Sequence, residues 1–128
     1  MDIPTDKQIF HGEIADYWME DGILVSLSKN PKRTVENISG NMKLVKEISG
    51  DKPIPLLIYL CNSPVPDKET RKFAVKALPE IYSAMAMVSK PGLSKFIINI
   101  LFKLKPPPIP MKSFIDDKKA KEWLNQFL

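Results

Sequence analysis

The side chains best suited to catalysis are scarce in this chain of 128 residues, which has one histidine and one cysteine. His11 and Cys61 form the simplest base-and-nucleophile pair that the composition allows, because a reactive thiolate needs a base or a cation beside it. The alternative for Cys61, a small buried hydrophobic residue at the end of a strand, is the better interpretation. The composition excludes an internal disulfide and any zinc site built from several cysteines or histidines.

Motifs for phosphate binding and hydrolysis are also missing. The sequence contains no glycine-rich loop of the dinucleotide-binding or P-loop type. The triplet Gly92-Leu93-Ser94 lacks the second glycine of a nucleophile elbow. The paired carboxylates Asp116 and Asp117 are explained as a helix cap and a second acid that favours the helix dipole. We therefore expect a protein that is not an enzyme and uses no metal or cofactor.

One candidate binding loop follows a central apolar strand, where the partner sites of open α/β sheets collect. Its hydroxyl and charged side chains stand beside the expected start of a helix, where free amides and the dipole would stabilise a phosphate. The alternative is a Ser-Pro turn followed by an Asp cap, which uses the same residues for structure alone. The candidate partner-binding or phosphorylation residues are Ser63, Asp67, Thr70 and Arg71.

A second feature is the positive charge near the C-terminus, since five lysines and no acidic residue lie between Glu80 and Asp116. An apolar helix expected over residues 93–104 and flanked by lysines is similar to an interfacial helix. The alternative, a buried helix with solvated lysines at its ends, is favoured because each lysine adds only about 1 kcal/mol to binding anionic lipid. The candidate contacts with lipid or an anionic surface are Lys95, Phe96, Asn99, Phe102, Lys103 and Lys105. Nucleic acid is an unlikely partner, because aromatic residues are not interleaved with these lysines.

The elements that must position these residues alternate between strands and helices after an initial hairpin. Strands over residues 9–19 and 23–28 flank an Asp21-Gly22 turn. The further elements expected are a helix from Thr34 to Gly50, a buried strand over 54–60, a helix capped by Asp67 and ended by Pro79, a strand over 82–88, the helix over 93–104, a strand over 111–115 and a helix capped by Asp116. This order predicts one α/β domain with a mostly parallel sheet and about four helices, preceded by a flexible extension over residues 1–8.

The start of the chain has no basic end followed by an apolar run, so no secretory signal is visible. The longest strongly apolar stretch, residues 96–104, is interrupted by Asn99 and Lys103 and is shorter than the about 20 residues that span a bilayer. We therefore expect a cytoplasmic protein.

Four segments carry a resemblance to a known fold. They are the strand Pro55-Leu56-Leu57-Ile58, the helix around residues 69–73, the block from Gly92 to Phe102, and the ending formed by residues 110–114 with Ala120 and Glu122-Trp123-Leu124. With these segments the chain resembles small bacterial proteins related to the STAS domain, the fold of the sporulation anti-sigma-factor antagonist. The resemblance implies a non-enzymatic regulatory or protein-interaction module, often a homodimer.

The resemblance also indicates where the chain departs from that family. The antagonists carry an Asp-Ser-Ser-type phosphorylation site at the start of the helix after the central strand. Here the same place holds Asp67-Lys68-Glu69-Thr70, so the paired serine is missing and Thr70 is the nearest hydroxyl in register. The fold is also similar to the CRAL-TRIO lipid-transfer domain, in which an apolar helix and its following loop gate a lipid pocket. This similarity implies an alternative function, binding of a lipid or apolar ligand through residues 93–104.

Overall fold

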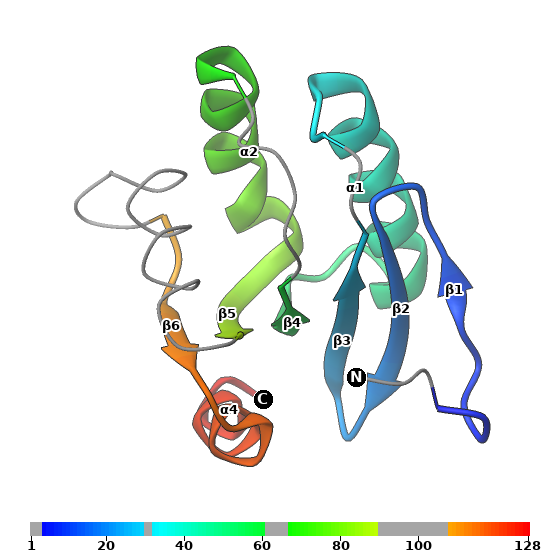
Figure 1. Ribbon diagram of the computed structural model, residues 1–128, viewed down its shortest axis with the longest axis vertical. Helices are drawn as coiled ribbons and strands as arrows, with labels where there is room; N and C mark the ends of the chain where they lie inside the picture. Colours follow the sequence, from blue (N-terminus) through cyan, green and yellow to red (C-terminus); the bar gives the residue numbers. More distant parts are fainter. Residues whose placement is uncertain (1–3, 30–31, 61–66, 90–107) are drawn as a thin grey trace.

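The structure is a computed structural model that describes residues 4–29, 32–60, 67–89 and 108–128. Six strands form one sheet in which their spatial order follows their order along the chain (Figure 1). The strands are β1 (Phe10–His11), β2 (Ala15–Glu20), β3 (Ile23–Ser28), β4 (Ile54–Tyr59), β5 (Tyr82–Val88) and β6 (Met111–Phe114). The helices are α1 (Val35–Ser49), α2 (Lys68–Ile81), α4 (Asp117–Leu124) and the short 3-10 helix η1 (Asn125–Phe127).

The sheet is mixed, which corrects the expectation of a mostly parallel one. β1, β2 and β3 pair antiparallel, whereas β3, β4, β5 and β6 pair parallel. The antiparallel half exists because tight turns join its strands, while the parallel half needs a longer crossover between successive strands. The described residues contain three α-helices, and the fourth that we expected, over residues 93–104, lies outside them.

Helices cover the sheet on both faces. Because neighbouring side chains of a strand point to opposite faces, Tyr17 of β2 joins the apolar cluster beneath α1 and α2, and Trp18 joins the cluster beneath α4. In the same way, Leu56 of β4 joins the cluster beneath α1 and α2, and Leu57 joins the cluster beneath α4. Figure 1 shows α1 and α2 beginning at the same end of the molecule, with α4 at the other end. The start of α2 is therefore remote from α4.

Local signals fix several boundaries as the sequence predicted. Thr34 caps α1 in a reciprocal arrangement with Asn37, and Gly50 ends it in the left-handed conformation with φ 72°. The β2–β3 turn has positive φ at both Asp21 (49°) and Gly22 (84°), as a type I′ hairpin requires. Within the described ranges, no helix combines the length and the apolar character that crossing a membrane requires.

Two expected boundaries were wrong. Residues 9–19 form two strands, because the chain reverses at a turn in which the Gly12 amide donates to the carbonyl of Ala15 at 2.9 Å. A side chain at Gly12 would bring its Cβ within 2.8 Å of that same oxygen, so the turn favours glycine. Pro79 does not end α2, which continues to Ile81. Pro79 lies on the exposed side of the helix, where water can satisfy the carbonyl that the proline leaves unbonded.

Candidate functional site

The first turn of α2 is the best-defined part of the predicted binding loop. α2 follows β4, which lies between two parallel neighbours, so its first turn comes at the carboxyl end of the sheet. Asp67 caps the helix, and its Oδ1 accepts a hydrogen bond of 2.8 Å from the Thr70 amide. The backbone and side-chain hydrogen bonds from Thr70 lower the pKa of the Asp67 carboxyl group. Asp67 is therefore a fixed, exposed negative charge.

Thr70 and Arg71 complete this turn in different ways. Thr70 is only 3% exposed, and its side chain hydrogen-bonds to Asp67. A kinase would have to open the helix start to reach the Thr70 hydroxyl. Arg71 is half-buried, and its amide donates to the carbonyl of Asp67 at 3.0 Å. The structure thus brings three of the four predicted residues together, and Ser63 lies outside the described residues.

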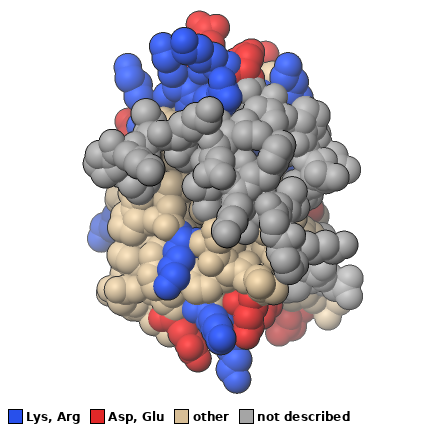
Figure 2. Space-filling model, turned by 60° about the vertical axis from the view of Figure 1, so that its left-hand side comes forward, with Lys and Arg blue, Asp and Glu red and all other residues tan. Residues whose placement is uncertain are grey.

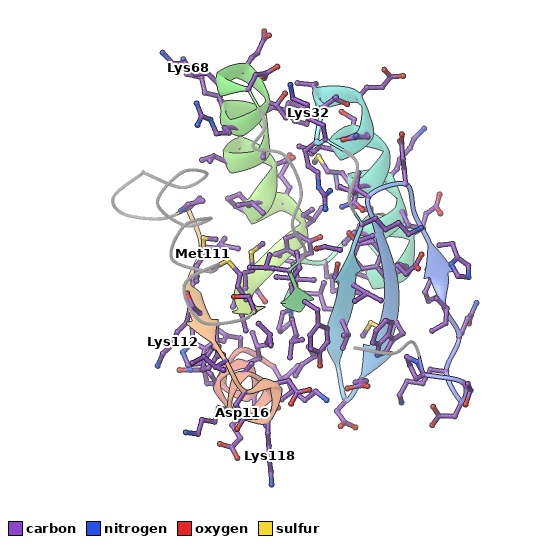
Figure 3. All side chains as sticks on the ribbon, viewed as in Figure 1. Lys32, Lys68, Met111, Lys112, Asp116 and Lys118 are labelled. Carbon is purple, nitrogen blue, oxygen red and sulfur yellow. The ribbon has the colours of Figure 1, made fainter. Side chains whose placement is uncertain are left out.

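Positive charge surrounds this turn. Lys32, in the segment before α1, and Arg71 both help to lower the pKa of Asp67 by their charge, after the larger effect of the Thr70 hydrogen bonds. Figure 3 places Lys32 and Lys68 at the same end of the molecule, and Figure 2 shows Lys and Arg side chains gathered there. Charge counted along the chain does not indicate this cluster, because its members come from segments far apart in sequence that meet at one end of the sheet.

His11, the candidate base for activating Cys61, lies in β1 at one edge of the sheet. Its Nδ1 is 3.0 Å from Asp16 Oδ1, and Lys29 Nζ is 2.9 Å from the same oxygen. Lys29 also donates to the carbonyl of Gly12 at 2.7 Å. Burial raises the pKa of Asp16, but the hydrogen bonds from Lys29 and His11 outweigh it, so the pKa is lowered. This group fastens β1 to β2, and Cys61 lies outside the described residues.

The paired carboxylates Asp116 and Asp117 have separate roles. Asp116 caps α4, as predicted, by accepting a hydrogen bond of 2.9 Å from the Lys118 amide. Asp117 accepts a hydrogen bond of 2.8 Å from the Tyr59 hydroxyl, which sequence spacing alone did not indicate. Burial and the carboxylate of Asp117 raise the pKa of Tyr59. Among the described residues, no three His, Cys, Asp or Glu side chains are placed to hold a metal ion.

The residues of the alternative function are not part of the described structure. All six candidate contacts with lipid or an anionic surface lie in the range 90–107, which the description leaves out. They are Lys95, Phe96, Asn99, Phe102, Lys103 and Lys105. The role assigned to them remains a prediction.

The fold is similar to that of a solved bacterial protein. A crystal structure of an uncharacterized protein of the DUF3478 family from Shewanella loihica PV-4, described as having a SpoIIAA-like fold, superposes with a TM-score of 0.55. The sequences are 16% identical over 97% of this chain and 98% of that one. At this identity the likeness shows the fold alone, and it supports the STAS-like resemblance. No finding supports the further likeness to CRAL-TRIO domains.

Sequence comparison gives the family. A search of curated proteins finds no match. A family model described as a domain of unknown function, DUF7793, matches residues 17–128, which is most of the chain. The protein therefore belongs to the DUF7793 family.

Proposed function

We propose that this protein is a non-catalytic protein-interaction module that binds its partner through the first turn of α2. The observation that supports this most directly is the position of that turn, at the carboxyl end of a central parallel strand. Asp67 presents a fixed charge there, and Arg71 follows it by one helical turn. The SpoIIAA-like fold supports the proposal only at the level of architecture.

The binding that we propose does not depend on phosphorylation of Thr70. The Thr70 hydroxyl is buried and bound to the Asp67 cap, so its modification would destroy the helix start. The turn instead carries a permanent negative charge at Asp67 and a permanent positive charge at Arg71. If a phosphate controls binding, we expect it on Ser63.

The test is affinity purification of the tagged full chain from its own cells, with co-purifying proteins quantified by mass spectrometry. Asp67→Ser keeps a good capping residue and removes the charge. Asp116→Ser makes the same change at the cap of α4, far from the proposed surface, and is the matched control. We expect Asp67→Ser and Arg71→Gln to lose a partner that wild type and Asp116→Ser retain.

Two outcomes would contradict the proposal. One is a partner recovered equally with all variants, which would place the binding surface elsewhere. The other is a wild-type chain that retains no protein and carries an added lipid-sized mass in native mass spectrometry. That second result would favour the alternative function, binding of a lipid or apolar ligand.

A further inference from the structure

Three exposed lysines form a row on the outer face of α2. Lys68, Lys72 and Lys76 follow one another at intervals of four residues, so their side chains lie one above the other on the helix. At 1.5 Å per residue the line is about 12 Å long, with about 6 Å between neighbours. We call these three residues the lysine ladder. Figure 2 shows the cationic end of the molecule at which the ladder starts.

The ladder is not explained by the stability of the helix. Like charges four residues apart repel each other, and Lys68 lies in the first turn, where the helix dipole disfavours a cation. Glu69 precedes Lys72 by three residues and Lys76 precedes Glu80 by four, and these two pairs of opposite charge offset part of the repulsion. A glutamine or a glutamate at position 72 would serve the fold better. The cost indicates that another requirement maintains the pattern.

The other two helices do not show such a line. On α1, Lys43 precedes Glu47 by four residues, which is a favourable spacing of opposite charges. On α4, Lys121 forms an ion pair of 2.7 Å with Glu20 of the sheet. Within the described part of the chain, the three ladder lysines have no carboxylate within ion-pair distance. The ladder is thus a feature of α2 and not of the helices in general.

We propose that the lysine ladder docks an acidic α-helix of a protein partner, whose carboxylates repeat at the same four-residue spacing. A helix has the same rise of about 6 Å over four residues, so its carboxylates match all three lysines at once. Lys32 lies beside the start of α2 and extends the cationic surface. The inference rests on the proposed function, because it names the chemistry of the partner that the module binds.

A protein fits this surface better than nucleic acid does. Asp67 and Glu69 are exposed between the cations and would repel the continuous phosphates of a nucleic acid. A protein helix can place a basic side chain opposite these acids while its carboxylates meet the lysines. Mixed charges of this kind give specificity and register.

The test measures fluorescence anisotropy of a labelled helical peptide that carries glutamate at every fourth position. Its control is a peptide of the same composition with the glutamates in scrambled order. The protein is the full chain, as wild type and as the triple variant K68Q/K72Q/K76Q, in which glutamine preserves helix propensity. The matched control is K43Q/K118Q/K119Q, which changes the net charge equally at exposed lysines elsewhere. Figure 3 shows Lys118 at the end of the molecule opposite Lys68.

We expect wild type to bind the periodic peptide more tightly than the scrambled one. The ladder variant should bind it about tenfold more weakly, since three exposed ion pairs are lost. The control variant should stay within about twofold of wild type. Equal weakening in both variants, or no binding by wild type at low salt, would overturn the inference. Ladder-dependent binding that is tighter to a single-stranded oligonucleotide or to phosphatidylglycerol vesicles would overturn it as well.

The same variants separate this inference from the proposed function. If the ladder variant retains in cells the partner that Asp67→Ser loses, the acidic-helix inference fails and the interaction module stands. If wild type retains no partner at all, the proposed function itself fails.

Discussion

The two layers that cover the sheet use their charged side chains in opposite ways. On the α4 side, Asp117 accepts the hydrogen bond of Tyr59, and Lys121 forms an ion pair with Glu20. On the other side, the ladder of α2 points its charges outward. The fold therefore explains Asp117 and Lys121 of α4, whereas it does not explain the ladder lysines of α2. This difference is why we look for the partner on α2.

α4 is a short helix, and the Tyr59–Asp117 hydrogen bond and the Lys121–Glu20 ion pair anchor it to the sheet. A helix of 8 residues has little stability by itself in water. Its Ala120 and Leu124 are fully buried against the sheet, and Trp123 packs on Phe114 and Phe127 with centroids 5.9 and 5.0 Å away. Contacts with the sheet and with the aromatic side chains of Phe114 and Phe127 therefore stabilise α4 along its length.

The inner side of the α1–α2 layer keeps its polar groups neutral. The Tyr17 hydroxyl donates to Asn41 Oδ1 at 2.6 Å, and Tyr82 hydrogen-bonds with Tyr17. Burial raises the pKa of both phenols. The interior of this layer contains these hydroxyl and amide groups, and the ladder lysines are on its outer surface. The two sides of the sheet therefore also differ in their inner polar groups. Charged side chains hold α4, whereas neutral hydroxyl and amide groups lie beneath α1 and α2.

The largest expected effect tests whether the α4 layer is part of the cooperative fold. Leu124→Ala should lower the free energy of unfolding by about 3 kcal/mol, because the buried methyl groups leave a cavity. Urea denaturation measures this. The matched control is Leu128→Ala, at the same end of the chain but 64% exposed, with an expected change within about 0.5 kcal/mol. Equal small effects from both variants would mean that α4 is attached loosely, and the comparison of layers would fail.

The next-largest expected effect is the loss of stability at alkaline pH that the tyrosines on the two sides of the sheet cause. All three tyrosines of the chain, Tyr17, Tyr59 and Tyr82, have a raised pKa: burial is the largest cause for each, and the Asp117 carboxylate adds to it for Tyr59. The folded state therefore retains phenol protons that the unfolded state loses above its pKa of about 10. Stability is fully present below that pH and falls as the pH rises, by up to about 1.4 kcal/mol per pH unit for each phenol.

Tyr59→Phe isolates the contribution of the α4 side. The variant should lose about 1–2 kcal/mol at neutral pH, because the Asp117 carboxylate loses its donor. Above the unfolded-state pKa its stability should fall with a slope about one third shallower than that of wild type. Phenolate absorbance and circular dichroism, followed together during titration, measure both. Phenolate that forms near the ordinary pKa while the protein stays folded would show that the three phenols are not held neutral.

Local signals account for the parts of the fold that the sequence analysis predicted correctly. The caps at Thr34 and Asp67 and the Asp21-Gly22 turn depend on a few neighbouring residues, so their spacing is sufficient. The turn at Gly12 is equally local, but a single glycine without a neighbouring Asn, Asp or Pro is a weak turn signal. Pro79 was misjudged because a proline on the exposed side of a helix costs less than one on its buried side.

The candidate site was predictable to a similar degree. The position of Asp67 follows from its capping role, but the burial of Thr70 depends on how α2 packs on the sheet. The lysine ladder was readable from spacing alone. Its signal is the four-residue spacing of lysines at residues 68–76, which a comparison of charge along the chain, such as that over residues 80–116, does not reveal.

The smallest expected effect bears most directly on the comparison of layers. Lys72 is the middle residue of the ladder, with a like charge four residues away on both sides and Glu69 three residues before it. Lys43 of α1 has Glu47 four residues on and a like charge, Lys46, three residues on. Lys72→Gln should therefore stabilise the protein by about 0.3 kcal/mol in urea at low salt. Lys43→Gln should change the stability less, because the lost attraction of Glu47 is offset by the lost repulsion from Lys46. At 1 M salt, where charges are screened over about 3 Å, both differences should vanish.

The sign of the Lys72→Gln effect is the decisive result. A lysine whose removal stabilises the fold and weakens binding of the periodic acidic peptide serves the surface and not the helix. If Lys72→Gln instead destabilises the protein, the ladder is a structural element like the anchors of α4. The contrast between the two layers would then give no reason to place an acidic partner on α2.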